Sequence, residues 1–246
     1  MAALDDWLNF TTKLLEGGVE VVTTGTINLK DESTSHPKVL SLLLLARTLS
    51  HVKGIRMLTK AGRTLEARIL VRNCFENSFW VGKLAKHGQK FVAEILEDEK
   101  KRRNARGQLL FDQQLEFEEE AEKKLRQWMK DHKSWSKSAT LTPKAVAKET
   151  AIEKTYVFYS ELSDDAHPST DSLARYLLPE DEHGNPGIDL EPPHKMEELI
   201  DTLHLNACAV LSVLFGVNDV MEAEASPMLT DLANEYMRLQ GQIAKS

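Results

Sequence analysis

The stretch that decides the fold is SHPKVLSLLLLARTLSHVKGIRMLTKAGRTLEARILVRNCFENSFWVGKLAKHG, residues 35–88. Its aliphatic residues recur at helical spacing in two runs, and each run is bounded by residues that favour helix ends. Ser35 can cap the first amides of a helix, and Pro37 suits the first turn. Gly62 and Gly88 are typical of the position after the last turn. The stretch therefore predicts two long helices that meet at Gly62.

The rest of the chain continues the helical pattern, so we predict one helical domain over residues 1–246. Its core is expected over about 35–217, and residues 218–246 are expected to add a C-terminal helix. Apolar positions that recur every three or four residues predict further helices at residues 3–24, 143–166, 194–216 and 220–244. Gly17-Gly18 is a candidate break in the first of these.

Residues 175–191 depart from the helical pattern. They place HGNPG, residues 183–187, between the short runs Tyr176-Leu177-Leu178 and Ile188-Asp189-Leu190. Two short extended runs around a Gly/Asn/Pro turn predict a small β-hairpin. The expected fold is therefore an all-α multi-helix bundle with long helices and a β-hairpin insertion.

Residues 89–132 are highly charged and contain few turn signals. Apolar residues at positions 117, 121, 125 and 128 mark one helical face, and pairs such as Glu97–Lys101 support a solvated helix. The interleaved acidic residues count against a nucleic-acid-binding arm. We expect a helical extension, bent near Gly107, that contacts a protein partner or a second copy of the chain.

The composition limits the classes of partner and compartment. The 246 residues include 38 acidic and 31 basic ones, a formal net charge of −7, which counts against a uniformly phosphate-binding surface. Cys74 and Cys208 lie in apolar stretches and are expected to be buried free thiols, which suits a reducing cytoplasm. The longest apolar runs, Val39–Ala46 and Leu205–Val217, are shorter than the roughly 20 residues that span a bilayer, and residues 1–10 lack a secretion signal. We expect a cytoplasmic protein with no membrane partner.

Several common catalytic signatures are absent from the sequence. It has no P-loop, no dinucleotide-binding glycine motif, no His-Glu-x-x-His, no Cys-x-x-Cys and no Gly-x-Ser-x-Gly. This counts against nucleotide hydrolysis, Rossmann redox chemistry, zinc hydrolysis and the α/β-hydrolase mechanism. We expect no cofactor.

The first candidate site lies on the predicted helix that begins at Arg63. Arg68, Arg72 and Glu76 recur every four residues and share one face, which Asn73 borders. Charges beside such an apolar helix need partners. One interpretation is an Arg72–Glu76 pair that tethers neighbouring helices, and the other is a functional site.

The second candidate site is the segment from Tyr159 to Ser169, YSELSDDAHPS. His167 follows the expected end of a helix, where the negative end of the helix dipole favours its protonated form. Such a histidine can exchange protons near neutral pH. Alternatively, His167 only caps the helix carbonyls and Ser169 caps the next turn. Tyr159 and Ser163 lie on the same predicted helix.

Arg47 and His51, four residues apart on the first long helix, could face the same polar seam or only line the margin of the core. Metal binding has two weak candidates. The first is the cluster Asp164, Asp165, His167 and Asp171, and the second is the pair Asp201 and His204 near two glutamates. A carboxylate-bridged metal centre needs two such pairs on partner helices, and no second pair is present. We therefore expect no metal.

The motif ARILVRNCFE, residues 67–76, combined with Tyr159-x-x-x-Ser163-x-x-x-His167-Pro168-Ser169, resembles an uncharacterised bacterial family of all-helical domains of unknown function. Some of its members are encoded near mobile elements or defence genes. The resemblance covers about residues 35–215. It implies a helical domain and no established reaction.

A more distant similarity is to HEPN domains, helical bundles that include metal-independent ribonucleases. Their motif is an arginine, often followed by a polar residue, with a histidine a few positions later on the same helix. Arg72-Asn73 matches the first half, but positions 77–79 are Asn, Ser and Phe. The resemblance thus implies a ribonuclease only if His167 supplies the imidazole from another helix.

Two hypotheses of different classes follow from these residues. In the first, Arg72 stabilises charge on RNA or a nucleotide, His167 acts as general acid or base, Glu76 orients Arg72, and Arg68 completes the site. In the second, the same residues, with Tyr159, Ser163, Asn73, Arg47 and His51, bind a ligand or partner without catalysis.

Overall fold

The computed structural model describes residues 3–24, 35–113, 118–132, 140–180, 183–192, 194–224 and 226–243. These residues form ten α-helices, one 3-10 helix and no strand. The α-helices are α1 (Leu4–Thr24), α2 (Pro37–Lys60), α3 (Thr64–His87), α4 (Gln89–Asp112), α5 (Glu119–Asp131), α6 (Pro143–Ala147), α7 (Tyr156–Ala166), α8 (Thr170–Ala174), α9 (Met196–Met221) and α10 (Pro227–Ile243). The predicted all-α bundle is confirmed.

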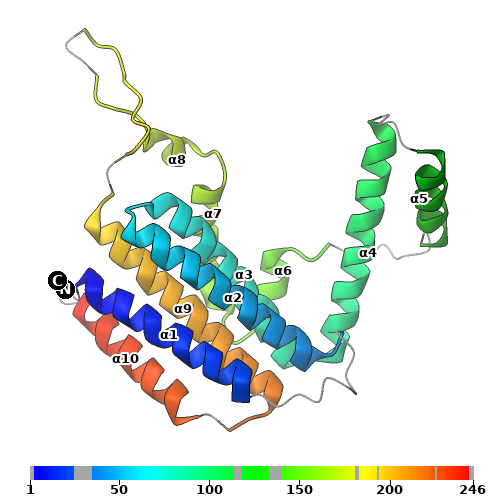
Figure 1. Ribbon diagram of the computed structural model, residues 1–246, viewed down its shortest axis with the longest axis horizontal. Coiled ribbons are helices and arrows are strands. Elements are labelled where there is room, and N and C mark those ends of the chain that lie inside the picture. Colours follow the sequence, from blue (N-terminus) through cyan, green and yellow to red (C-terminus); the bar gives the residue numbers. More distant parts are fainter. Residues whose placement is uncertain are drawn as a thin grey trace.

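Helix α9 forms the centre of the bundle. It packs against α3, α2, α1 and α10, which lie side by side around it (Figure 1). Most of its residues are buried, because its sequence is apolar on nearly every face. By length and composition α9 could also cross a membrane, but 72% of its most apolar window is buried inside the bundle. It is therefore explained as a core helix.

Glycines allow the core helices to approach closely. A Cβ atom at Gly216 of α9 would lie 2.7 Å from Val81 of α3, and one at Gly18 of α1 would overlap the side chain of Leu49 of α2. Helix α1 continues through Gly17-Gly18, so the candidate break there is wrong. Gly18 and Gly216 allow the helices to pack closely, and this packing compensates for the low helix propensity of glycine.

The predicted β-hairpin is not seen. The described part of residues 175–191 contains one isolated bridge, between Leu177 and Ile188, and two flanking backbone hydrogen bonds. Pro179 and Pro186 lack the N–H groups that a longer ladder needs. The segment therefore turns back on itself without forming strands.

Several element ends differ from the sequence-based prediction. His36, not Ser35, caps α2, because its Nδ1 accepts a hydrogen bond from the Lys38 amide. Helix α9 continues past Asn218 to Met221 and ends where Glu222 adopts a left-handed conformation (φ 57°). The predicted helix over 143–166 is divided into α6, the 3-10 helix Glu153–Thr155 and α7.

The charged extension is a two-helix arm made of α4 and α5, which stands away from the bundle (Figure 1). Helix α4 runs straight through Gly107, so the predicted bend there is wrong. Gly107 is buried because Met129 of α5 packs against it. A Cβ atom at this position would lie only 2.9 Å from the sulfur of Met129. The predicted apolar residue Phe117 lies outside the described residues.

Candidate ligand-binding site between α3 and α7

Aromatic packing fixes α7 against α3. Phe79 of α3 contacts the rings of Tyr156 and Tyr159, at centroid distances of 6.2 and 5.7 Å. One turn earlier, Phe75 packs against Phe158, with 6.0 Å between their centroids. Phe75 and Phe79 are fully buried. These contacts bring the predicted motif of α3 next to the predicted motif of α7.

Four of the candidate residues meet at this junction. Arg72 donates from Nε to Ser163 Oγ (3.0 Å) and from Nη2 to the Tyr159 hydroxyl (2.5 Å), and its guanidinium lies 4.5 Å from the centre of the Tyr159 ring. Its Nη1 lies 3.7 Å from a carboxylate oxygen of Glu76. The Arg72 side chain remains 20% exposed and that of Glu76 36%. We call Arg72, Glu76, Tyr159 and Ser163 the Arg72 cluster.

A surface hollow adjoins the Arg72 cluster. Tyr156 stacks on Tyr159 with 5.5 Å between the ring centroids, and it also lines a depression of about 850 Å³. Lys154, Val157 and Ser160 line the same depression. Burial raises the pKa of Tyr159, although the charge of Arg72 opposes this shift. Tyr159 therefore presents a neutral hydroxyl to Arg72, and its neighbour Tyr156 borders the hollow.

Arg68, one turn before Arg72 on α3, is buried and bound to carboxylates. Its side chain is 6% exposed, and its guanidinium donates to three carboxylates, those of Asp165 (2.6 Å), Asp201 (3.1 Å) and Glu161 (2.8 Å). Burial alone would lower the pKa of Arg68, but the hydrogen bonds to Asp165 and Glu161 and the charge of Asp201 outweigh it and raise the pKa. Arg68 is thus enclosed in ion pairs.

The ion pairs of Arg68 continue into a longer network. Asp165 also accepts a hydrogen bond from Arg175 (3.2 Å), which forms a second ion pair with Glu198 (2.6 Å). This hydrogen bond to Glu198 is the main reason that the pKa of Arg175 is raised. On the other side, Asp201 lies 3.9 Å from His204. The network connects α3, α7 and α9 and has a structural role.

Replacing Asp201 with asparagine should change the response of the protein to acid. Burial alone would raise the pKa of Asp201, but the neighbouring His204 and Arg68 outweigh it and lower the pKa below 3.8. Ionised Asp201 therefore contributes stability that is present above this value and is lost as the pH falls through the lower folded pKa. Urea unfolding from pH 7 to pH 3 should show a smaller loss in Asp201→Asn than in the wild type. The exposed Asp231→Asn is the control and should follow the wild type.

His167 lies outside the Arg72 cluster. It follows the last residue of α7, its backbone amide donates to the Ser163 carbonyl (3.2 Å), and its side chain is exposed. Two residues earlier, Asp165 binds Arg68, so the end of α7 lies toward the Arg68 end of α3 and not toward Arg72. Among the described residues, none orients the imidazole through a hydrogen bond. Ser169 caps α8, as predicted by the alternative in which this segment only caps helix ends.

The remaining candidates are not brought into the cluster. Arg47 is exposed on α2, and Asn73 is half-buried on α3. His51 is half-buried, and its Nε2 is buried without a hydrogen-bond partner in the described part of the chain. Burial, and then the charge of Arg47, lowers the pKa of His51. Both effects favour the neutral form of His51.

A family model covers much of this region. It matches residues 38–185 and describes a family of unknown function, DUF5677. The chain belongs to this family. The match spans the helices α2 to α8, and so includes the Arg72 cluster. No curated protein and no solved structure matches the chain.

Sequence reasoning missed the partners of Arg68 in this DUF5677 protein. It noted Asp165 only in a weak metal cluster and Asp201 only beside His204, but both carboxylates bind Arg68. Glu161 was not singled out, although it lies four residues before Asp165 on α7. An arginine beside an apolar helix face needs carboxylate partners, and this requirement was the signal that could have predicted these ion pairs.

Proposed function

We propose that this protein binds a small phosphate-bearing ligand at the Arg72 cluster and does not turn it over. The observation that carries this proposal is the contrast between its two neighbouring arginines. Arg68 donates hydrogen bonds from Nε and both Nη groups to carboxylates. Arg72 donates to two neutral hydroxyls, and its Nη1 lies 3.7 Å from the carboxylate of Glu76. Arg72 therefore keeps positive charge that a ligand can use.

The position of Arg72 is suited to an anion. A guanidinium offers several N–H groups in a fixed plane, which matches the oxygens of a phosphate. Ser163 and Tyr159 already hold this plane, so binding costs little side-chain entropy. A phosphate that takes the place of Glu76 at Nη1 would gain a charge-assisted hydrogen bond. The hollow beside Tyr156, which is lined by both Lys154 and Glu153, would receive the rest of the ligand.

The non-catalytic part of the proposal rests on His167. A general base must reach the proton that it removes, and a catalytic histidine is usually oriented by a third group. His167 is exposed beyond the end of α7 and lacks such an orienting group within the described residues. The buried free thiol of Cys74 fits a reducing, cytoplasmic setting for this binding protein.

The second candidate is a HEPN-like, metal-independent ribonuclease. It is favoured by one observation: Ser163, which binds Arg72, lies one helical turn before His167. If RNA lay along this face of α7, Arg72 would stabilise the phosphate, Glu76 would orient Arg72, and His167 would transfer the proton.

Binding is tested by thermal unfolding with a panel of inorganic phosphate, adenosine monophosphate and adenosine triphosphate. A ligand that prefers the folded state raises the melting temperature. Arg72→Ala should weaken this response about tenfold or more, because it removes a charged hydrogen-bond donor. Arg72→Lys should be intermediate, since it keeps the charge and loses the plane. Lys13→Ala on α1 is the control and should respond like the wild type.

The choice between the two candidates is made with labelled RNA in the presence of a chelator. The binding proposal expects no cleavage by the wild type. Cleavage that disappears in both Arg72→Ala and His167→Ala would reject the non-catalytic assignment and support the ribonuclease. If no member of the anion panel raises the melting temperature, the ligand-binding assignment fails.

A further inference from the structure

The described residues of the α4–α5 arm leave every residue of α5 at least partly exposed. Helix α5 has 13 residues, none of which is buried, although Leu125, Trp128 and Met129 form an apolar face. Helices of this length are marginal in water unless they pack against something. Within the described part of the arm, Leu125 and Met129 of this face pack against Gly107 of α4. Leu109 of α4 remains 52% exposed, so these residues leave apolar surface that one further element could cover.

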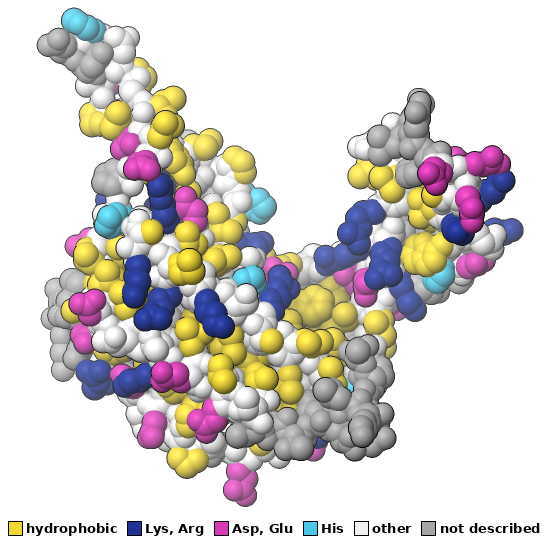
Figure 2. Space-filling model, in the orientation of Figure 1, with side chains coloured by type: hydrophobic (Ala, Val, Ile, Leu, Met, Phe, Trp, Pro, Cys, Tyr) yellow, Lys and Arg dark blue, Asp and Glu magenta, His cyan; other side chains and the backbone are white. Residues whose placement is uncertain are grey.

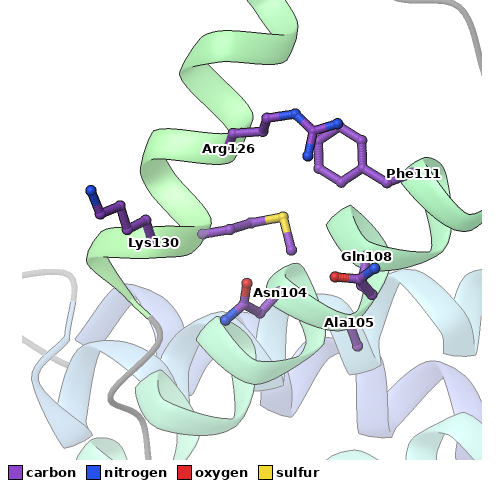
Figure 3. Close-up of a pocket in the computed structure, with 7 residues that line it drawn as sticks. Asn104, Ala105, Gln108, Phe111, Arg126 and Lys130 are labelled. Atoms are coloured by element: carbon purple, nitrogen blue, oxygen red, sulfur yellow. The ribbon is translucent and has the colours of Figure 1, made fainter.

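An open cavity lies along the seam of the arm, about halfway along it. It measures about 470 Å³ and is lined by side chains of both helices, with Arg126 above the ring of Phe111 at 4.1 Å (Figure 3). Asn104 and Gln108 line its floor, whereas the Lys130 side chain points away from it. The Oδ1 atom of Asn104 is buried and has no hydrogen-bond partner in the described part of the chain. The cavity thus combines apolar surface with an unsatisfied acceptor.

Charged residues of one sign gather at two places along the arm. The tip, where α5 begins, carries Glu118, Glu119, Glu120 and Glu122. Lower on α4 there are four consecutive basic residues, Lys100–Arg103, followed by Arg106, and Figure 2 shows Lys and Arg side chains gathered there. We call these the acidic tip and the basic segment. Arg106 is exposed and makes no ion pair within the described residues.

Three of the ion pairs on the arm are exposed enough to exchange their partners. Glu119–Lys123, Glu120–Lys124 and Arg103–Glu99 are pairs of residues four apart within one helix. All six side chains are at least 48% exposed. Such exposed pairs contribute only about 0.3–0.5 kcal/mol each. Glu119, Glu120 and Arg103 can therefore exchange these partners for charges on another surface, whereas Arg102 stays bound to Asp98, whose side chain is 5% exposed.

We infer that the arms of two copies of this chain pair antiparallel, so that the acidic tip of each meets the basic segment of the other and the two cavities close on one another. In a two-fold contact, each patch must face its complement on the partner. The tip lies level with Asp112, and the basic segment centres near Arg103. The midpoint is near Gly107 and Gln108, where the open cavity lies. Charge and shape therefore place the two-fold axis at the same point.

A second copy fits this surface better than a polyanion does. Nucleic acid would require a surface of one sign, but the acidic tip would repel it. The arm is also independent of the Arg72 cluster, since α4 and α5 contribute no residue to that cluster. Dimerisation through the arms and ligand binding can thus succeed or fail separately.

Charge reversal on the full-length chain tests this inference. The first variant is Glu119→Lys with Glu120→Lys, and the second is Arg103→Glu with Arg106→Glu. Each variant alone places like charges opposite one another. The dissociation constant of its dimer should therefore be at least about tenfold higher than that of the wild-type dimer. When the two variants are mixed, both contacts regain opposite charges. Sedimentation velocity should then show a heterodimer of wild-type stability.

Circular dichroism spectra and melting temperatures serve as the check that both variants fold. The wild-type dimer should weaken as salt is added, because the paired charges are exposed. In a separate test, Gln108→Cys should form a disulfide with its own copy across the axis, whereas Gln127→Cys on α5 should not. A wild type that remains monomeric at all concentrations would overturn the inference. A dimer that neither charge variant weakens would do so as well.

Discussion

Arg68→Ala is expected to lower the free energy of unfolding by about 3 kcal/mol, measured by urea denaturation. The substitution removes a cation that is 6% exposed and leaves the 10% exposed carboxylate of Asp165 without its shortest hydrogen bond. Breaking a buried pair typically costs about 3–5 kcal/mol. The lower end applies here because Arg175 still binds Asp165 at 3.2 Å.

The matched control is Arg63→Ala. Arg63 also forms an ion pair, with Glu191 at 2.8 Å, but their side chains are 43% and 77% exposed. An exposed pair contributes about 0–1 kcal/mol, so this variant should stay close to the wild type. Equal effects of the two substitutions would contradict a structural role for the network around Arg68.

Phe79→Ala is expected to cost about 3–5 kcal/mol of unfolding free energy, because it removes a fully buried ring and leaves a cavity. Phe79 is also the residue that holds Tyr156 and Tyr159 of α7 against α3. Its loss should therefore weaken ligand binding at Arg72 in addition to lowering stability. Anion titration of the folded variant, well below its melting temperature, measures the second effect.

Val19→Ala on α1 is the control for Phe79→Ala. Val19 is 52% exposed, and substitutions at such positions usually change stability by less than about 0.5 kcal/mol. If Phe79→Ala were as mild as this variant, the packing of α7 on α3 would have to be different from that described above.

The helices could be predicted from the sequence because their apolar spacing is strongly periodic. The stretch 35–88 has clear end signals, and the structure contains α2 and α3 there. Gly17-Gly18 and Gly107 misled the prediction, because a glycine signals both a break and a close contact. Which meaning applies depends on Leu49 and Met129, residues that are distant in sequence.

The candidate site could be predicted only in part. The periodicity of α3 placed Arg68, Arg72 and Glu76 on one face, and the three residues that contact Arg72, namely Glu76, Tyr159 and Ser163, were all among the candidates. The direction of α7 relative to α3 could not be derived from periodicity. This direction brings Asp165 to Arg68 and leaves His167 at the end of α7, without a contact to Arg72 among the described residues. The sequence therefore indicated the residues of the site but not their division into two clusters.

The most direct test of the account follows the side-chain Nε–H signals of Arg72 and Arg68 by NMR while inorganic phosphate or adenosine monophosphate is added. The signals are assigned with Arg72→Lys and Arg68→Lys. We predict that the Arg72 signal shifts in a saturable manner and that the Arg68 signal, held by Asp165, stays in place. A shift of Arg68 alone, or binding that leaves the Arg72 signal unchanged, would contradict the assignment of Arg72 as the ligand-binding arginine.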